Sequence, residues 1–155
     1  MASDTNDGRI PPELLKKRLL ALLETRKGEF APANPEIDKY EHSLQCATRA
    51  HRAGEPPDYV VMALFHDVFG GFSATEHGLM LLSSLGPYIG DRSYAALENH
   101  ESQMELVRAG VETPEMSSMI ISFTFARDYD FPSFDPHYST LSLRYLKRTI
   151  NEVIK

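Results

Sequence analysis

Apolar residues along this chain recur at the spacing of helical turns, and no segment alternates polar and apolar positions long enough to predict a strand. Leu15, Leu19 and Leu22 share one stripe of a helix that begins after Pro11 and ends at Gly28. Proline, glycine and capping residues bound further helices at about 37–53, 55–67, 74–85, 92–109, 114–123 and 141–155. No linker, repeat or low-complexity tract divides the chain. The pattern predicts one all-α domain over residues 1–155, a compact bundle of about six to eight helices with residues 1–10 as a flexible N-terminus.

Several boundaries rest on particular residues. Asn34-Pro35-Glu36 is predicted to cap the second helix, and residues 73–76 fit a capping box for the fourth. Asp91 is predicted to cap a fifth helix that runs unbroken through His100. The aromatic, proline-containing stretch 128–140 is predicted to be a loop before the last helix.

The composition narrows the classes of protein to which this chain can belong. Its formal net charge of −6 disfavours binding to a nucleic-acid backbone. The first ten residues lack a basic segment followed by an apolar run, and no apolar run approaches the length of a membrane span. Cys46 is the only cysteine, so an internal disulfide is excluded and a reducing compartment is allowed. We therefore expect a cytoplasmic protein that acts on small molecules and binds neither nucleic acid nor membrane, and its oligomeric state stays open.

The stretch ALFHDVFGG, residues 63–71, places a histidine and an aspartate at the end of the most apolar segment of the chain. Burying His66 and Asp67 is costly, so either hydrogen bonds satisfy them or they hold an ion. Histidine and carboxylate side chains are common metal ligands, and further candidates occur on the predicted helices and after them: His42, His77, His100, Asp128, Asp130 and Asp135. Single helical histidines are more often surface or hydrogen-bonded residues, and His51 and His137 are expected to be of that kind.

Two motifs carry a resemblance to a known family. The segments EHSLQCA (residues 41–47) and ALFHD (residues 63–67) resemble the HD-domain superfamily of metal-dependent enzymes. Within it they are most similar to the mixed-valent diiron oxygenases, which include phosphonate-degrading enzymes and, more distantly, myo-inositol oxygenase. The resemblance is strong over residues 40–70, fair over 73–107 and thin at FARDYD, residues 125–130.

The resemblance implies an all-α HD domain around two iron ions, Fe²⁺ and Fe³⁺, with Mn²⁺ or Mg²⁺ as the alternative. One ion would be held by His42, His66, Asp67 and a late aspartate, and Asp67 would bridge to the second ion. His77 and His100 would complete the second ion's ligands. The oxygenases carry an arginine, two residues and then the aspartate, a spacing that Arg127 and Asp130 match, so Asp130 is favoured over Asp128.

The substrate side of the site is predicted from the same comparison. Arg127 is the candidate catalytic residue, facing the substrate, or else it pairs with Asp128. Tyr40, close to His42, and Met104, one turn after His100, are the other substrate-binding candidates.

The chain also departs from the oxygenase pattern. Ala74 stands where those enzymes have a histidine, so either His77 binds the second ion in an altered geometry, the helix has another register, or the second ion is weak or absent. Gly70 and Met104 replace a histidine and a lysine that hold the anionic substrate in the phosphonate oxygenases. These losses argue against a phosphonate substrate.

Three functions follow from these features. We favour an O₂-using diiron oxygenase that oxidises a small hydroxylated molecule, because the predicted site is apolar and carries few cations. A metal-dependent phosphohydrolase is the second candidate, although phosphate chemistry usually recruits several lysines or arginines. The third is an HD fold repurposed without redox chemistry.

Overall fold

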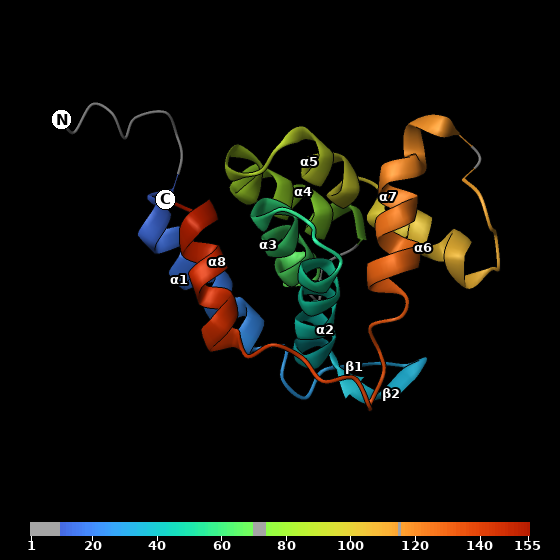
Figure 1. Ribbon diagram of the computed structural model, residues 1–155, viewed down its shortest axis with the longest axis horizontal. Helices are drawn as coiled ribbons and strands as arrows, with labels where there is room; N and C mark the ends of the chain where they lie inside the picture. Colours follow the sequence, from blue (N-terminus) through green and yellow to red (C-terminus); the bar gives the residue numbers. More distant parts are fainter. Residues whose placement is uncertain (1–9, 70–73, 115) are drawn as a thin grey trace.

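The computed structural model describes residues 10–69, 74–114 and 116–155, with the backbone alone for residues 74–78. Within these residues the helices are α1 (Pro12–Glu24), α2 (Lys39–Arg52), α3 (Pro57–Phe65), α4 (Ala74–Leu85), α5 (Asp91–Leu97), α6 (His100–Arg108), α7 (Ile120–Phe125) and α8 (Leu143–Val153). Short helical turns, η2 (Gly86–Tyr88), η3 (Ser117–Met119) and η4 (Ala126–Asp130), join them. Figure 1 shows these helices gathered into one bundle. The predicted all-α bundle of six to eight helices is confirmed.

Helix α3 lies at the centre of the bundle, and every side chain from Tyr59 to Phe65 is buried. It packs against α2, α5 and α8, which explains why its sequence is apolar on all sides instead of along one stripe. Figure 1 shows α1 and α8 on one side of α3, and α6 and α7 on the other. His66 follows α3 directly, so the central helix delivers it into the interior of the bundle.

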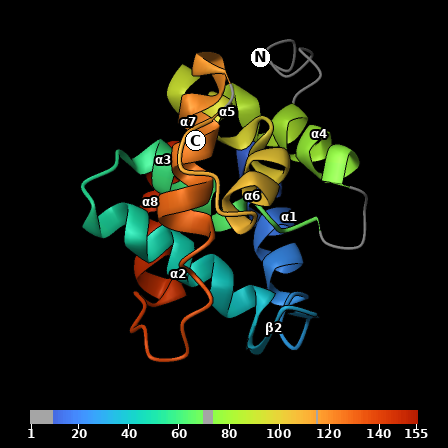
Figure 2. The same cartoon turned by 90° about the vertical axis from the view of Figure 1, so that its right-hand side faces the viewer.

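A small hairpin precedes α2, where the sequence predicts only a capped helix start. Strands β1 (Phe30–Ala31) and β2 (Asn34–Asp38) pair antiparallel, and Figure 2 shows them beside the first turn of α2. The cap of α2 is Asp38, not the predicted Asn34-Pro35-Glu36: its carboxylate accepts the backbone N–H of Glu41 at 2.8 Å. The same carboxylate accepts the backbone N–H of Gly28 at 2.9 Å, so it also fixes the turn after α1.

The predicted helix 92–109 is wrong as a single element. Asn99 adopts the left-handed conformation (φ 65°), which no α-helix interior allows, and it separates α5 from α6. His100 is therefore the first residue of α6, and its ring Nδ1 donates to the carbonyl oxygen of Leu97 at 2.7 Å.

The predicted loop after residue 127 starts later than expected. The helix α7 continues into η4, a turn of π-helix in which the N–H of Phe131 reaches the carbonyl of Ala126 at 2.8 Å. Asp130 is the last residue of this turn and is buried. At its start, α7 begins at Ile120, after the η3 turn, and not near residue 114.

Candidate metal centre

Four buried side chains from three elements meet in the interior of the bundle. They are His42 and Cys46 from α2, His66 at the end of α3 and Asp130 at the end of η4, and their ligand-type atoms all lie within 4.8 Å of one another. His42 Nε2 lies 3.0 Å from Asp130 Oδ1, and His66 Nε2 lies 3.5 Å from the same oxygen. Two ligand atoms that each lie about 2.1 Å from one ion are roughly 3.0–3.4 Å apart. The distances of 3.0 and 3.5 Å are close to these values, so the two imidazoles and the carboxylate could hold one ion.

Backbone hydrogen bonds orient both imidazoles of this cluster. Nδ1 of His42 donates to the carbonyl oxygen of Ser133 at 2.9 Å, and Nδ1 of His66 donates to that of Ala63 at 2.7 Å. With Nδ1 committed to a carbonyl, Nε2 is the ring nitrogen that faces Asp130, and it is the atom that could bind a metal in place of a proton. Histidine ligands in metal sites are usually held in this way by a second hydrogen bond.

Cys46 packs on the cluster without the geometry of a ligand. Its sulfur lies 3.6 Å from Nε2 and 4.0 Å from Nδ1 of His42. These distances are nearly equal, so the sulfur sits over the face of the ring and not beyond Nε2, where an ion would lie. Phe134 stacks on the same ring at 3.9 Å between centroids and 12° between planes, and it must cover the other face. His42 is thus held between a thiol and a phenyl ring.

The charges in the cluster reinforce one another. Burial alone would raise the pKa of Asp130, but the facing imidazoles of His66 and His42 hold it well below its usual range. Burial acts against the charged form of His66, yet the carboxylates of Asp130 and Asp67 raise the pKa of His66 to about 9. Burial and the carboxylates of Asp130 and Asp67 raise the pKa of the Cys46 thiol well above its usual value. The thiol therefore stays protonated, and a metal ion that binds Nε2 of His66 would have to displace the proton of that nitrogen.

The residues proposed for a second ion are placed only in part. His100 is buried, and its ring lies 5.5 Å from that of His66 and 6.4 Å from that of Phe125, between centroids. Its Nε2 lies 3.5 Å from a carboxylate oxygen of Glu101. Asp67 follows His66 and is half-buried beside the cluster. The side chain of His77 and all of Gly70 lie outside the described residues.

Arg127 does not join the cluster. Its guanidinium donates to both carboxylate oxygens of Asp128, at 2.8 and 3.0 Å, and the two side chains are 50% and 43% exposed. This is the surface ion pair that the sequence left open, and the role of Arg127 toward a substrate stays a prediction. Of the two candidate carboxylates, Asp130 lies in the cluster and Asp128 lies at the surface. The two aspartates are two residues apart, and residues at that spacing on a helical turn point to nearly opposite sides.

The other two substrate-binding candidates differ in their positions. Tyr40 lies two residues before His42, about 200° around the helix, and therefore faces away from the cluster. It is half-buried, with the Lys27 ammonium 4.7 Å from its ring centroid. Met104 is buried on the same face of α6 as His100, one turn later, which keeps it available to the site.

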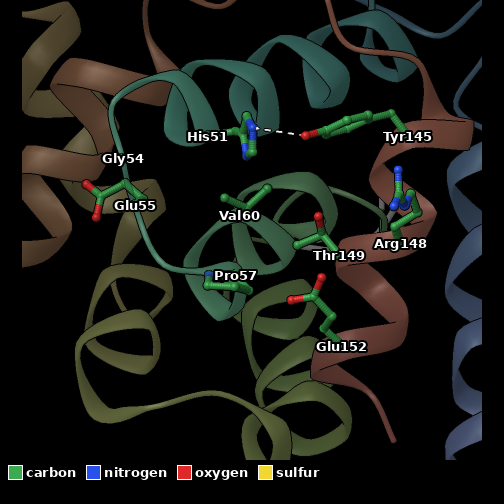
Figure 3. Close-up of a pocket in the computed structure, with 9 residues that line it drawn as sticks. All are labelled: His51, Gly54, Glu55, Pro57, Val60, Tyr145, Arg148, Thr149 and Glu152. Atoms are coloured by element: carbon green, nitrogen blue, oxygen red, sulfur yellow. Dashed lines mark hydrogen bonds between the residues drawn. The ribbon is translucent and has the colours of Figure 1, made fainter.

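A separate pocket of about 440 Å³ lies away from these residues (Figure 3). Residues from the end of α2, the start of α3 and α8 line it, among them His51, Val60, Tyr145 and Arg148. His51 is exposed and its Nε2 lies 3.5 Å from the Tyr145 hydroxyl, while His137 is exposed in the loop before α8. Neither histidine approaches the metal-type cluster, as the sequence predicts.

Sequence reasoning missed Cys46 and two residues that contact His42, Ser133 and Phe134. Cys46 stands four residues after His42, and that spacing on a helix is a signal that could have placed it beside the imidazole. Ser133 and Phe134 lie in the segment predicted as loop, where no periodicity indicates which side chains point inward.

Comparison with protein-family models and with curated proteins found no match to this chain. Among the described residues, no helix combines the length and the apolar character needed to cross a bilayer.

Proposed function

We propose that this protein is a metal-dependent enzyme of the HD-domain type, an oxygenase that uses two iron ions and O₂ to oxidise a small hydroxylated substrate. The observation that carries the proposal is the buried cluster of His42, His66 and Asp130, in which Nε2 of both imidazoles faces one carboxylate oxygen at 3.0 and 3.5 Å. These residues occur in the order of the HD pattern, on three separate elements.

The donor set fits the proposed metal. Two neutral imidazoles and one carboxylate suit iron, manganese and zinc, and are too rich in nitrogen for a site built for Mg²⁺ or Ca²⁺. Iron is chosen among them because of the resemblance to the diiron oxygenases. Bound iron would supply the electron transfer that O₂ activation requires.

The proposal assigns a role to each candidate ligand of the two ions. His42, His66 and Asp130 would hold the first ion, and Asp67, the residue after His66, would bridge to a second. His100, and His77 from α4, would hold the second ion. The apolar side chains of Phe125 and Met104, both buried, keep water from this part of the interior.

An oxygenase is favoured over a phosphohydrolase because the proposed site offers few cationic side chains. The arginine that the sequence offers for an anionic substrate, Arg127, is paired with Asp128 at the surface. Phosphoryl transfer usually relies on several such groups at the reacting centre.

The same reasoning indicates the substrate. One buried charge-assisted hydrogen bond contributes roughly 1.5–3 kcal/mol, so the two groups lost at Gly70 and Met104 weaken anion binding by about 3–6 kcal/mol. We expect a short 1-hydroxyphosphonate to bind at least about a hundredfold more weakly than a neutral or mono-anionic hydroxylated molecule of similar size. Titration of the iron-loaded protein, followed by its absorption spectrum, measures both. Tight binding and turnover of the phosphonate would contradict the expectation.

The experiment that tests the function starts from protein purified without added metal. Elemental analysis should find iron, and the reduced protein should consume O₂ in the presence of hydroxylated compounds. His66→Ala should lose both the iron and the O₂ consumption, whereas His51→Ala, which changes an exposed histidine outside the cluster, should keep both. Mn²⁺- or Mg²⁺-dependent phosphate release without O₂ consumption would replace the oxygenase by the phosphohydrolase. A protein free of metal under all these conditions would leave only the repurposed fold.

A further inference from the structure

A chain of hydrogen bonds connects the surface of the bundle to the metal-type cluster. Its centre is Glu55, in the segment between α2 and α3. The Tyr129 hydroxyl donates to Oε2 of Glu55 at 2.6 Å, and the Arg92 guanidinium donates to both oxygens of the same carboxylate, at 2.6 and 3.0 Å. Three hydrogen bonds from two elements thus fix one side chain of a short connecting segment.

The aromatic side chains around this chain keep it in place. The guanidinium of Arg92 lies 4.6 Å from the centre of the Tyr59 ring, and the Tyr59 ring lies 5.6 Å from that of Tyr129. Figure 3 shows the Glu55 carboxylate directed away from Tyr145 and the α8 side chains of the pocket. Glu55 lies at the edge of the pocket, but its carboxylate points away from it and binds Arg92 and Tyr129.

We call the hydrogen-bonded group of Arg92, Glu55 and Tyr129 the clamp. Tyr129 links this clamp to two members of the cluster. It immediately precedes Asp130 in the η4 turn, so fixing its ring also fixes the backbone that carries the Asp130 carboxylate. Its carbonyl oxygen accepts the Ser133 hydroxyl, and the Ser133 carbonyl in turn accepts Nδ1–H of His42. The position of Tyr129 thus affects both the Asp130 carboxylate and the His42 imidazole that faces it.

We propose that Glu55 and Tyr129 are positioning residues of the metal centre, which hold the η4 turn so that Asp130 and His42 converge on one ion. The inference rests on the proposed metal-binding function of the cluster. A π-helical turn is an uncommon element that often occurs at functional sites. The hydrogen bonds of Arg92 and Tyr129 to Glu55 hold this turn from outside the site.

The test is a Co²⁺ titration of the full-length protein, followed by the visible absorption bands of the bound ion. Groups behind metal ligands typically change affinity by roughly 10–100-fold, so Tyr129→Phe and Glu55→Ala should each weaken Co²⁺ binding by about tenfold and alter the band shape. Glu55→Gln keeps an acceptor for the tyrosine hydroxyl and should restore part of the affinity. The matched control is Tyr59→Phe, which removes a hydroxyl from the neighbouring buried ring and leaves the Glu55 hydrogen bonds in place.

The outcomes separate this inference from the function on which it rests. Equal Co²⁺ affinity and equal spectra for Tyr129→Phe and Tyr59→Phe, with the unmodified protein binding Co²⁺, overturn the positioning role alone. No Co²⁺ binding by the unmodified protein overturns the metal site and the positioning role together. If Tyr129→Phe does not fold, Arg92→Ala tests the same clamp from its exposed end, with Arg144→Ala on α8 as the control. A several-fold loss of Co²⁺ affinity in the first and none in the second supports the proposal, and equal affinities overturn it.

Discussion

His42 and His66 each have one ring nitrogen committed to a backbone carbonyl and one directed at Asp130. Hydrogen bonds with Asp130 alone could satisfy both rings, and the distances of 3.0 and 3.5 Å allow it. What favours a metal is that His42, His66 and Asp130 are buried together and that both imidazoles face the same oxygen atom of Asp130. Such an arrangement places a carboxylate between two bases, where a cation satisfies all three at once.

His66→Ala tests the most central member of this set. Its removal leaves the buried Asp130 with His42 as its remaining imidazole partner, so the metal-free protein should lose about 3 kcal/mol of unfolding free energy. The metal-bound form should lose more, because the metal's own contribution disappears as well. Urea unfolding with and without added metal measures both, with the exposed His51→Ala as the reference. Curves for His66→Ala that coincide with those of the reference, with and without metal, would show that His66 neither binds a metal nor stabilises the buried Asp130.

Glu55 predicts a pH dependence of stability. The hydrogen bonds from Arg92, together with that from Tyr129, lower the pKa of its carboxyl despite partial burial. A group whose pKa is lower in the folded state stabilises the protein above its unfolded pKa, about 4.3 for glutamate, and loses that contribution as the pH falls through the folded value. The melting temperature of Glu55→Gln should therefore be below that of the unmodified protein at pH 7, and the gap should close below about pH 4.

Glu112→Gln is the control for this measurement, because Glu112 is exposed and away from the clamp. A gap for Glu55→Gln that stays constant from pH 7 to pH 3 would mean that the charge of Glu55 contributes nothing through Arg92.

Among the secondary-structure elements, α3 was predictable and α6 was not. The unbroken apolar run from Tyr59 to Phe65 can be satisfied only by a helix surrounded by others, and this placed His66 in the interior. The break at Asn99 carries no glycine or proline, and asparagine is also tolerated inside helices, so periodicity alone extended one helix across it. Similarly, a π-turn differs from an α-turn by one residue per turn, which is below what a hydrophobic pattern can resolve over five residues.

The candidate site was predictable to the same degree as its elements. The resemblance to the HD pattern predicted that His42, His66 and Asp130 converge, and they do so because α2 packs against both α3 and η4. The side chains that required knowledge of loop geometry, Ser133 and Phe134, were not predictable. Arg127 was placed by its three-residue spacing from Asp130 alone, and that spacing does not determine which residues of the turn face solvent.

The break at Asn99 makes a prediction about backbone conformation. Asparagine and glycine accept the left-handed region, whereas other residues are strained there by roughly 1–2 kcal/mol. Asn99→Gly should therefore leave the melting temperature nearly unchanged, while Asn99→Ala should lower stability by about 1 kcal/mol and loosen the start of α6, where His100 lies. Thermal melting of both variants distinguishes them. Asn99→Ala as stable as the glycine variant would indicate that α5 and α6 can join into one helix.

Across the whole molecule, the cluster joins residues 42, 66 and 130, which lie on elements far apart in the sequence. An unfolded chain holds these side chains apart, so an ion that binds the cluster binds the folded protein in preference to the unfolded one. Binding of a metal to the cluster would therefore be linked to folding, and the bundle as a whole should respond to the metal.

Added metal should raise the melting temperature of the full-length protein, and chelation should lower it. At a metal concentration about 100 times the dissociation constant, the folded state gains about 2.7 kcal/mol. For a domain of this size, each kcal/mol shifts the melting temperature by about 2–4 °C, so the expected rise is roughly 5–11 °C. The double variant His42→Ala/His66→Ala should show no such rise, because the remaining carboxylate cannot hold the ion alone. Calorimetric scans with Fe²⁺ under anaerobic conditions, or with Co²⁺, measure the shift, and an equal rise in the double variant would place the metal elsewhere on the protein.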